Sequence, residues 1–499
     1  MRQLTSLDAQ FLAIEDGRAH GHVSGLAIYG PSALDADRVR SLIAERIHLL
    51  PPFRWRLATV PLGLDHPYWV EDDAFDLEFH VRELALPAPG DDRQFAEQVA
   101  RIVARPLDRA RPLWELYVIH GLRDGRVALL TKMHHAAVDG MSGAEVLSVL
   151  LDTAPTGRDV PPAGDRGGEV RTPGELGMLA RGVAGLPRQP VRAVAAVPRT
   201  LPHLDSVAML RHVPGIGTTA AISRRLARLS PRRRDGGILQ GATLRAPRTR
   251  FQGSITPHRR VAFGSLPLAD VKAVKNAAGC TVNDVVMTIC AGALRDWLAA
   301  RGELPSDPLL TMVPVSVRTP EQRGTFGNRI STMVVPLPTD EAEPALRLRR
   351  MHDAMRAAKD RHRATPATLL QDANHFIPPA LLARAARVTS RVAVSNHLKA
   401  PVNLVISNVP GSPVPLYCAG ARLEAQYPIS AIVDGVGLNI TVLSYEDRLD
   451  FGVVADRTML DDPWELIERL RTALAELLEL VLPGGELARA QPGEAACLA

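Results

Sequence analysis

The chain has 499 residues, of which 46% are hydrophobic and 4% aromatic, and its formal net charge is +5. This length is too great for one hydrophobic core and indicates two globular domains of ordinary size. The four cysteines (Cys280, Cys290, Cys418 and Cys497) have no paired spacing, so the composition offers no disulfide framework and favours a reducing compartment.

The N-terminal segment lacks the pattern of a secretory signal peptide, because Asp8, Glu15 and Asp16 interrupt any apolar run. The longest uncharged run worth testing as a membrane span covers residues 400–421, and it is broken by prolines, a glycine and polar residues. A spanning helix is therefore not expected there. We expect a protein made in the cytoplasm that meets any membrane from its surface.

Residues 1–165 alternate between strand and helix patterns and are predicted to form an N-terminal subdomain. The expected elements are strands at His22–Tyr29 and Arg126–Met133, and helices at Asp37–Ile47, Arg93–Ala104 and Ser142–Thr153. Residues 251–482 repeat this alternation and are predicted to form a C-terminal subdomain. Its helices are expected at Leu268–Ala278, Val282–Leu298, Ala345–Arg361 and Pro463–Leu480, and its strands at Leu309–Val317, Ser331–Leu337, Val402–Ser407, Val436–Tyr445 and Leu449–Val454.

A linker rich in Pro, Gly and Arg, residues 166–250, separates the two halves. From Arg181 to Arg234 it has eleven arginines and one acidic residue, Asp205, for a net charge of +10, which leaves the rest of the chain at −5. The basic character is thus confined to the linker. Because no aromatic residues are interleaved and no binding module accompanies it, nucleic acid is not an expected partner.

Two roles for the linker remain open. It could be a solvated crossover between the domains. Alternatively, short amphipathic pieces such as Ile222–Leu229, followed by Arg232, Arg233 and Arg234, could lie on an anionic membrane or lipid-droplet surface. Residues 483–499 are expected to form a disordered tail.

The motif HHxxxDG occupies residues 134–140, where a predicted strand ends and a predicted helix begins. A histidine held at such a junction can present a ring nitrogen to a cleft and accept a proton from a hydroxyl or amine. Asp139 can turn back and hold the loop, and Gly140 permits a tight bend. Ser142 and Glu145 form a capping-box pattern for the helix that follows.

Other interpretations of this motif stay open from the heptapeptide alone. His134 and His135 are neighbours on a strand and point to opposite faces, which disfavours one shared metal ion. No HExxH or CxxC pattern and no third ligand at metal spacing lies nearby. A histidine satisfied inside the core is the remaining alternative to catalysis.

The motif is accompanied by other segments in a definite order. They are Pro106–Arg109, Arg111–Glu115 with the tripeptide PLW, Thr281–Val286, Phe326–Arg329, Ser407–Gly411, Leu416–Arg422 and Asp450–Gly452. Taken together, the chain from Leu7 to about Leu482 resembles the bacterial wax ester synthase/acyl-CoA:diacylglycerol acyltransferase family. HHxxxDG alone is shared with chloramphenicol acetyltransferase-like enzymes and peptide-synthetase condensation domains, whereas the PLW, Asn-Asp and SNVPG segments narrow the resemblance to lipid acyltransferases.

The resemblance implies an α/β protein of two domains with the chloramphenicol acetyltransferase-like fold, mixed sheets and an active-site tunnel between the domains. It implies transfer of a long-chain acyl group from acyl-CoA to diacylglycerol, with wax ester formation from a long-chain alcohol as a second reaction. Acyl-CoA would be a substrate, and no further cofactor and no metal are expected. The protein would work on the inner face of the plasma membrane or on lipid inclusions.

The resemblance also assigns roles within the motif. His135 would be the general base, and His134 would support it or pack. Asp139 would hold the loop through an ion pair, for which Arg318, at the end of a predicted strand, is the candidate partner. Gly140 would border the substrate.

Asn283 has two readings that sequence alone does not separate. Asparagine is a good helix N-cap, and this one precedes an apolar helix. The resemblance to the family's Asn-Asp motif instead places its amide N–H at the oxyanion. Asp284 is explained as a structural residue by the helix dipole.

Five more residues are candidates for substrate binding by resemblance, and each has a plain structural alternative. Pro112, Leu113 and Trp114 would line the acyl or alcohol pocket, or pack in the core. Ser407 and Asn408 would lie near the domain interface, or simply form a turn.

No GxSxG elbow and no cysteine in a thiolate-stabilising context is present in the sequence, which favours direct acyl transfer over a covalent acyl-enzyme. Two alternatives to a lipid acyltransferase remain. One is a non-catalytic lipid-surface protein that kept the fold. The other is a condensation-type acyltransferase that uses a carrier-protein thioester.

Overall fold

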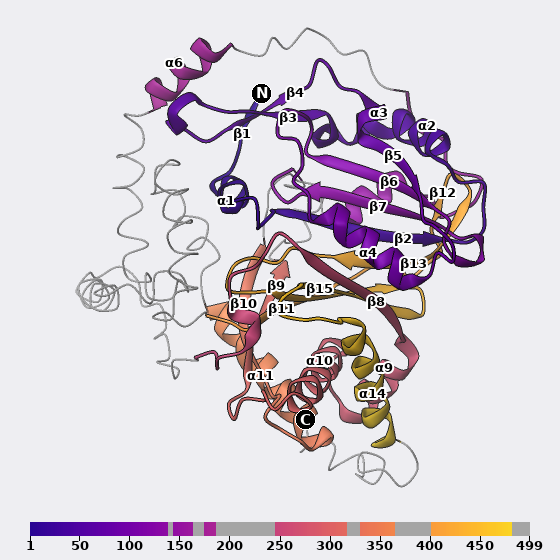
Figure 1. Cartoon of the computed structure of the whole chain (residues 1–499), viewed down its shortest axis with the longest axis vertical. Coiled ribbons are helices and arrows are strands. Elements are labelled where there is room, and N and C mark those ends of the chain that lie inside the picture. The colour runs from indigo at the N-terminus through magenta and orange to yellow at the C-terminus, as the bar shows by residue number, and fades with distance from the viewer. Residues whose placement is uncertain (138–142, 163–173, 186–244, 317–329, 365–400, 482–499) are drawn as a thin grey trace.

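The computed structural model describes residues 1–137, 143–162, 174–185, 245–316, 330–364 and 401–481. These residues form two six-stranded sheets, a three-stranded sheet and helices that cover them (Figure 1). Both large sheets mix parallel and antiparallel strands, so the predicted α/β architecture with mixed sheets is confirmed.

The first large sheet has the strand order β12-β13-β2-β7-β6-β5. Its strands are β2 (His22–Tyr29), β5 (Val81–Ala85), β6 (Trp114–His120), β7 (Val127–His134), β12 (Tyr417–Cys418) and β13 (Ala421–Ile429). The central pair is antiparallel and places His22 opposite His134. Strands β12 and β13 come from the second half of the chain, yet β13 pairs with β2 and extends the first sheet. The two halves are therefore joined by a shared sheet.

The second large sheet has the strand order β10-β9-β11-β14-β15-β8. Its strands are β8 (Arg259–Pro267), β9 (Leu309–Ser316), β10 (Ile330–Leu337), β11 (Leu404–Val409), β14 (Leu438–Tyr445) and β15 (Arg448–Asp456). Only β11 runs parallel to its neighbours, β9 and β14. A small sheet of β1 (Arg2–Gln3), β3 (Trp55–Ala58) and β4 (Tyr68–Glu71) stands beside the two large ones.

Helices cover the two faces of the first sheet differently. On one face α2 (Ala36–Arg46) and α5 (Gly143–Leu150) share a hydrophobic cluster with residues of β2, β6 and β7. On the other face α4 (Asp92–Val103) packs between this sheet and β8. Helix α4 forms because Asp91 and Gln94 make a capping box and because Phe95, Val99 and Val103 fall on one face at helical spacing.

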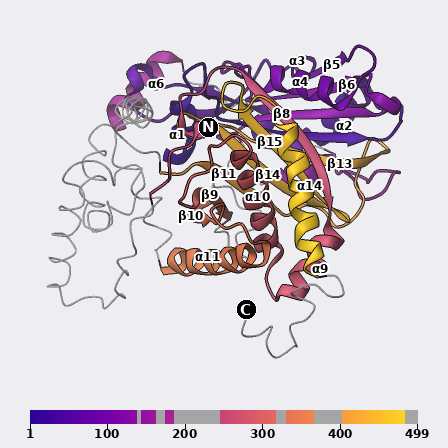
Figure 2. The same ribbon diagram turned by 60° about the horizontal axis from the view of Figure 1, so that its bottom comes forward.

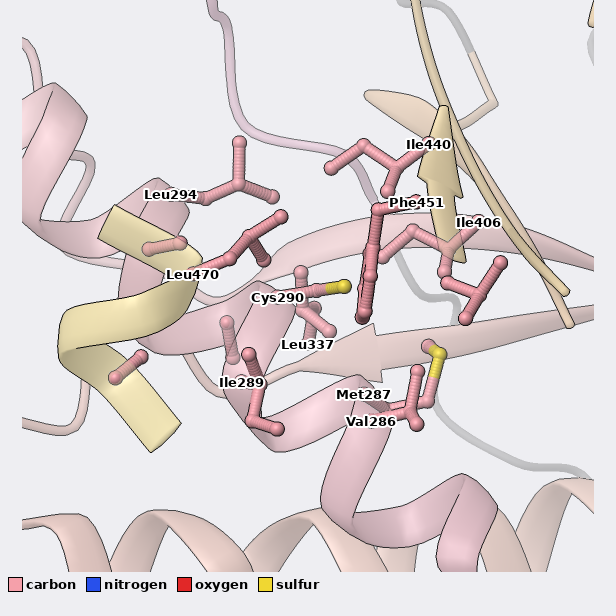
Figure 3. Close-up of a cluster of buried hydrophobic side chains, with 14 of the residues drawn as sticks. Val286, Met287, Ile289, Cys290, Leu294, Leu337, Ile406, Ile440, Phe451 and Leu470 are labelled. Carbon is pink, nitrogen blue, oxygen red and sulfur yellow. The ribbon is translucent and has the colours of Figure 1, made fainter. Parts of the chain in front are cut away.

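The second sheet is covered by α9 (Leu268–Ala278), α10 (Val282–Ala299), α11 (Pro344–Ala364) and α14 (Trp464–Glu479). Figure 3 shows how α10 fills the space between the sheet and α14. Its residues Val286 and Cys290 lie against Ile406 and Phe451 of the sheet. The first half also contains α1 (Ser6–Ile14) and α3 (Leu77–His80), and α6 (Glu175–Gly185) follows it.

The sequence predicted the periodic elements within one or two residues in most cases. It missed the helices α1, α3 and α6 and the strands β1, β3, β4, β5, β6, β8, β12 and β13. Strand β6 reads as a continuous buried run, because both of its faces are covered, and so it lacks the alternation of a half-exposed strand. No single helix in the described ranges is long and apolar enough to cross a membrane. Helices α9 and α10 meet that criterion only as a pair bent by 105°, and the apolar side chains of α10 are buried in the core.

Candidate active site at the end of strand β7

His134 is the last residue of β7, and both of its ring nitrogens have partners. Nδ1 accepts a hydrogen bond from the backbone N–H of Ala136 at 3.1 Å, and Nε2 lies 3.1 Å from Oε1 of Glu15. Because Nδ1 accepts, Nε2 carries the proton and donates it to the carboxylate. The backbone N–H of His134 also donates to the carbonyl of Leu113 at 2.9 Å. This buried histidine is therefore fixed in one orientation and one tautomer.

Glu15, at the C-terminal end of α1, is the acidic partner of His134. Its carboxylate also accepts the backbone N–H of Gly21 at 2.9 Å and the guanidinium of Arg109 at 2.6 Å. Burial alone would raise the pKa of Glu15, but the hydrogen bond and electrostatic contribution of His134, with the hydrogen bonds from Arg109 and from the Gly21 N–H, lower it well below its ordinary value. Glu15 is therefore ionised at neutral pH and supplies a fixed negative charge beside His134.

Glu15 was not predicted as a site residue. It lies 119 residues before His134, and no local sequence pattern connects the two positions.

The close packing around His134 also requires a glycine at position 21. A Cβ atom at this position would lie 2.8 Å from the carbonyl oxygen of Phe11 and 2.9 Å from Nε2 of His134. Only glycine lets α1 and the start of β2 approach the histidine so closely.

His135 lies against α1. Its ring stacks on Phe11 with a centroid distance of 4.4 Å and an interplanar angle of 6°, and its backbone N–H donates to the carbonyl of Gly21 at 2.7 Å. Burial and, secondly, an electrostatic contribution from His134 lower the pKa of His135 to about 4, although a hydrogen bond to its own backbone acts in the opposite direction. The imidazole is therefore neutral at pH 7. In the tautomer that carries its proton on Nδ1, Nε2 keeps its lone pair and can accept a proton.

Asn283 is not the N-cap of α10, so that reading is wrong. The N-cap is Thr281, whose side chain accepts the N–H of Asp284 while the carboxylate of Asp284 accepts the N–H of Thr281. The carboxylate of Asp284 also lies 2.9 Å from Nδ1 of His352, which gives this buried residue a second structural contact beyond the helix dipole. The side chain of Asn283 instead accepts a hydrogen bond from Nδ2 of Asn408 at 3.2 Å.

The Asn283–Asn408 contact joins two predicted site residues that are 125 positions apart. Asn408 lies on β11 and Asn283 in the first turn of α10, so both belong to the second half of the chain. With its Oδ1 occupied, Asn283 keeps its amide N–H groups as donors, in the orientation that this hydrogen bond assigns. Ser407 precedes Asn408 on β11 and is half-buried.

The PLW tripeptide lies behind the motif. Leu113 is fully buried beside Ala136, and its carbonyl holds the N–H of His134. Trp114, the first residue of β6, is 3% exposed and packs in the core. Its Nε1–H donates to the carbonyl of Phe53 at 2.8 Å. Pro112 is also buried. This burial favours the core-packing alternative, in which the tripeptide supports the histidines through the backbone.

Three predicted site residues lie outside the described part of the chain: Asp139, Gly140 and Arg318. The ion pair between Asp139 and Arg318 therefore stays a prediction. Ser142 of the predicted capping box and the arginines Arg232–Arg234 also lie outside the described residues, whereas Glu145 belongs to α5.

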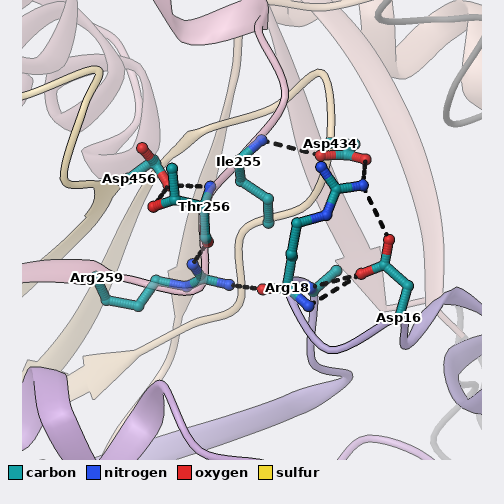
Figure 4. A network of polar contacts seen from close by, with 8 residues as sticks. Asp16, Arg18, Ile255, Thr256, Arg259, Asp434 and Asp456 are labelled. Atoms are coloured by element: carbon teal, nitrogen blue, oxygen red, sulfur yellow. Dashed lines mark hydrogen bonds and ion pairs between the residues drawn. The ribbon is translucent and has the colours of Figure 1, made fainter.

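A polar network ties the loop that carries Glu15 to the second half of the chain (Figure 4). Arg18 pairs with Asp16 at 3.2 Å and with Asp434 at 3.3 Å, and the other oxygen of Asp434 accepts the N–H of Ile255. Arg259 donates to the carbonyl of Arg18. Because this loop holds both Glu15 and Gly21, contacts between the two halves fix the position of the histidine pair.

The cysteines of the described residues are not suited to nucleophilic catalysis. Burial raises the pKa of Cys280 to about 11 and those of Cys290 and Cys418 to about 12, so all three stay protonated thiols at neutral pH. This agrees with acyl transfer that does not pass through a thioester of the protein.

Comparison with known proteins relates the chain to one family. The family model of the wax ester synthase/diacylglycerol acyltransferase (WS/DGAT) catalytic domain matches residues 4–286. The model of the WS/DGAT C-terminal domain matches residues 326–478. A Mycobacterium tuberculosis H37Rv protein that carries the name diacylglycerol O-acyltransferase is 36% identical over 485 residues, which cover 96% of this chain and 90% of that protein.

Solved structures agree with this relation. The wax ester synthase/diacylglycerol acyltransferase of Marinobacter aquaeolei VT8 is 32% identical, with a TM-score of 0.64 over 95% of this chain and 98% of the other. The first condensation domain of the calcium-dependent antibiotic synthetase has a TM-score of 0.53 at 18% identity over 96% of each chain, and shares the fold.

Proposed function

The chain belongs to the wax ester synthase/diacylglycerol acyltransferase family, and we propose on this basis that His135 is its general base. The protein is an acyltransferase that moves an acyl group to diacylglycerol. A long-chain acyl-CoA is the donor in this proposal, and the products are triacylglycerol and free CoA. Transfer to a long-chain alcohol, which gives a wax ester, is the second reaction.

The reaction needs a general base for the acceptor hydroxyl and a hydrogen-bond donor that stabilises the oxyanion of the tetrahedral intermediate. Nε2 of His135 takes the proton of the acceptor hydroxyl while the hydroxyl oxygen attacks the thioester carbonyl carbon. The tetrahedral intermediate then collapses, the C–S bond breaks, and the imidazolium returns its proton to the leaving thiolate. An imidazole that is neutral at pH 7 is in the correct state to begin, and its low pKa makes the return of the proton favourable.

Asn283 is proposed to donate an amide N–H to the oxyanion of the intermediate. The hydrogen bond from Asn408 to its Oδ1 supports this role, because it orients the amide and leaves the donor side free. Direct transfer of this kind requires no cofactor beyond acyl-CoA.

The observation that carries the proposal is the fixed state of the histidine pair. His134 is held at both nitrogens by Ala136 and Glu15, and His135 is stacked and kept neutral. A protein that only coats a lipid surface has no need of this buried charged arrangement, which costs free energy to assemble. A condensation-type enzyme would need a carrier-protein thioester as donor.

One assay tests the proposal. Purified protein receives labelled palmitoyl-CoA together with detergent-dispersed diacylglycerol or hexadecanol, and the lipid products are separated and counted. We expect labelled triacylglycerol and, in the second reaction, wax ester. Release of free fatty acid with no ester formation from either acceptor would contradict the proposal.

Diacylglycerol is a membrane lipid, and we propose that the protein works while bound to an anionic lipid surface. An exposed apolar corner supports this. Leu62 is 84% exposed at the tip of the loop before β4 and adopts φ +60°, while Leu176 and Val183 of α6 are 82% and 53% exposed. Helix α6 packs on that loop, where Gly182 lies against Val60. We call Leu62, Leu176 and Val183 the apolar corner. Helix α6, which carries the last two of them, is labelled in Figure 1.

The positive charge of the neighbouring linker also supports a membrane contact at the apolar corner. Arg181 is exposed on α6, and it begins the segment to Arg234 whose net charge is +10. Apolar side chains that insert and arginines that meet lipid phosphates act together at an interface. The apolar corner and the basic linker would therefore face the same membrane.

Co-sedimentation with vesicles of phosphatidylcholine and phosphatidylglycerol tests this attachment. The variant with both Leu62→Ser and Leu176→Ser should bind roughly 10²–10⁴-fold more weakly, because each leucine that inserts fully contributes about 1.5–3 kcal/mol. Leu346→Ser is the control, since Leu346 is 39% exposed on α11. Equal binding by both variants and the wild type would refute a role for the apolar corner.

A further inference from the structure

Helix α11 makes a polar contact with the turn that carries Asn283, and this contact has no role in the proposal above. Nδ1 of His352, near the middle of α11, lies 2.9 Å from Oδ2 of Asp284, which follows Asn283 directly in α10. Figure 2 shows α11 running across below α10, and the two helices share a hydrophobic cluster to which α11 contributes Leu348 and Met355. His352 lies one turn from each of these two residues, at the edge of the apolar face of α11.

The buried carboxylate of Asp284 depends on this histidine. Asp284 is 1% exposed, and its Oδ2 accepts the backbone N–H of Thr281 at 2.9 Å in addition to the contact with His352. Because a carboxylate only accepts, Nδ1 of His352 carries the proton. Within the described ranges, Oδ1 of Asp284 has no hydrogen-bond partner, and His352 is the only basic side chain within ion-pair distance. Loss of His352 would leave a buried charge poorly compensated and favour a movement of Asp284 toward water.

A movement of Asp284 would be transmitted to Asn283. The carboxylate of Asp284 closes the capping box with Thr281, and Asn283 lies between these two residues in the first turn of α10. The hydrogen bond from Asn408 that orients the Asn283 side chain is 3.2 Å long, at the upper end of the usual range. A catalytic group must be held within about 0.5 Å of its productive position. The backbone of this turn must therefore supply part of that precision.

We propose that His352 is a positioning residue for acyl transfer, which fixes the first turn of α10 through Asp284 and so holds the amide of Asn283 toward the oxyanion. His352 itself does not touch the substrate. This inference rests on the proposed function, in which Asn283 stabilises the tetrahedral intermediate. It gives a part in the reaction to α11, a helix that carries none of the motif segments of the family.

Three variants separate the hydrogen bond of His352 from its packing. His352→Asn keeps an N–H donor near the position of Nδ1, His352→Leu has a similar size and no donor, and His352→Gln places its N–H near the position of Nε2. Leucine is a better helix former than asparagine, so helix stability alone would favour His352→Leu. We expect His352→Leu and His352→Gln to lower kcat roughly 10–100-fold with KM nearly unchanged. His352→Asn should recover most of the rate.

A matched control and a double-mutant cycle show whether His352 acts through Asn283. His362→Leu changes a histidine further along the same helix and should keep wild-type kcat. Residues that act as a unit give losses that do not multiply. In the Asn283→Ala background, His352→Leu should therefore change kcat by less than roughly 2-fold. Independent losses that multiply would show that His352 only stabilises the fold, and would overturn the inference.

Hydrogen exchange of the full-length protein gives a readout that does not depend on turnover. The N–H of Asp284 donates to Oγ1 of Thr281, and in His352→Leu it should exchange roughly 10-fold faster while the last turn of α10 keeps its wild-type rates. His352→Asn should exchange as the wild type does. Unchanged exchange in His352→Leu, or a kcat of His352→Asn no higher than that of His352→Leu, would also overturn the inference. These results leave the proposed function standing, whereas wild-type turnover in Asn283→Ala would refute the oxyanion role and the role of His352 together.

Discussion

Replacing Glu15 tests whether the buried acid positions the histidine pair. In Glu15→Ala, the Nε2–H of His134 and the N–H of Gly21 lose their acceptor. Each hydrogen bond to a carboxylate contributes about 1.5–3 kcal/mol. The side chain of Arg109 is 49% exposed and can turn to water, so its pair adds little. We therefore expect the free energy of unfolding to fall by about 3–5 kcal/mol, as for a broken buried ion pair.

The matched activity experiment uses Glu15→Gln, which keeps an acceptor oxygen and removes only the charge. Its kcat should fall, roughly 10²-fold if His135 shifts by about 1 Å, while KM for palmitoyl-CoA stays unchanged. Glu468→Gln is the control, because Glu468 makes an exposed ion pair with Arg471 and its loss should cost well under 1 kcal/mol.

The pH dependence of stability separates the charge of Glu15 from its packing. Folding lowers the pKa of this carboxyl below its ordinary value of 4.5, so its stabilisation is present above pH 4.5 and is lost as the pH falls. Wild type and Glu15→Gln should therefore differ in denaturant midpoint at pH 7, and the difference should shrink progressively as the pH falls below 4.5. A constant difference across this range, or full activity in Glu15→Gln, would refute the positioning role.

The remaining predictions concern the groups that meet the substrate. His135→Ala should lower kcat by roughly 10²–10⁴-fold with the fold intact, whereas His134→Ala should act mainly through stability; a folded His135→Ala protein with wild-type turnover would sink the mechanism. Because the pKa of His135 is lowered to about 4, kcat/KM should stay flat from pH 8 down to about pH 5, and a fall centred near pH 6.5 would show that the base is an ordinary histidine. Asn283→Ala should reduce kcat by roughly 10²–10³-fold, and Asn408→Ala should cause a smaller loss with KM unchanged. Asn283→Ser should be equally impaired, and a silent serine variant would remove Asn283 from the reaction.

Local patterns in the sequence determined the periodic elements and the family. Strand β2 and helix α9 have the predicted bounds, because hydrophobic spacing and flanking turn residues lie within each segment. The HHxxxDG motif was placed correctly between a strand and a helix for the same reason. The resemblance in ordered motifs predicted the acyltransferase family, which the comparisons confirm.

Only the tertiary structure decided which groups meet. The sequence alone did not pair Glu15 with His134, or Asn283 with Asn408. It placed all of residues 251–482 in the C-terminal subdomain, although β13, which lies in that range, pairs with β2 in the first sheet. The N-cap of α10 is Thr281, two positions before Asn283, because Thr281 and Asp284 make a reciprocal capping contact. Such contacts form because packing brings distant parts of the chain together. The residues next to a carboxylate or amide in the sequence do not reveal whether its side chain will contact water or a buried partner.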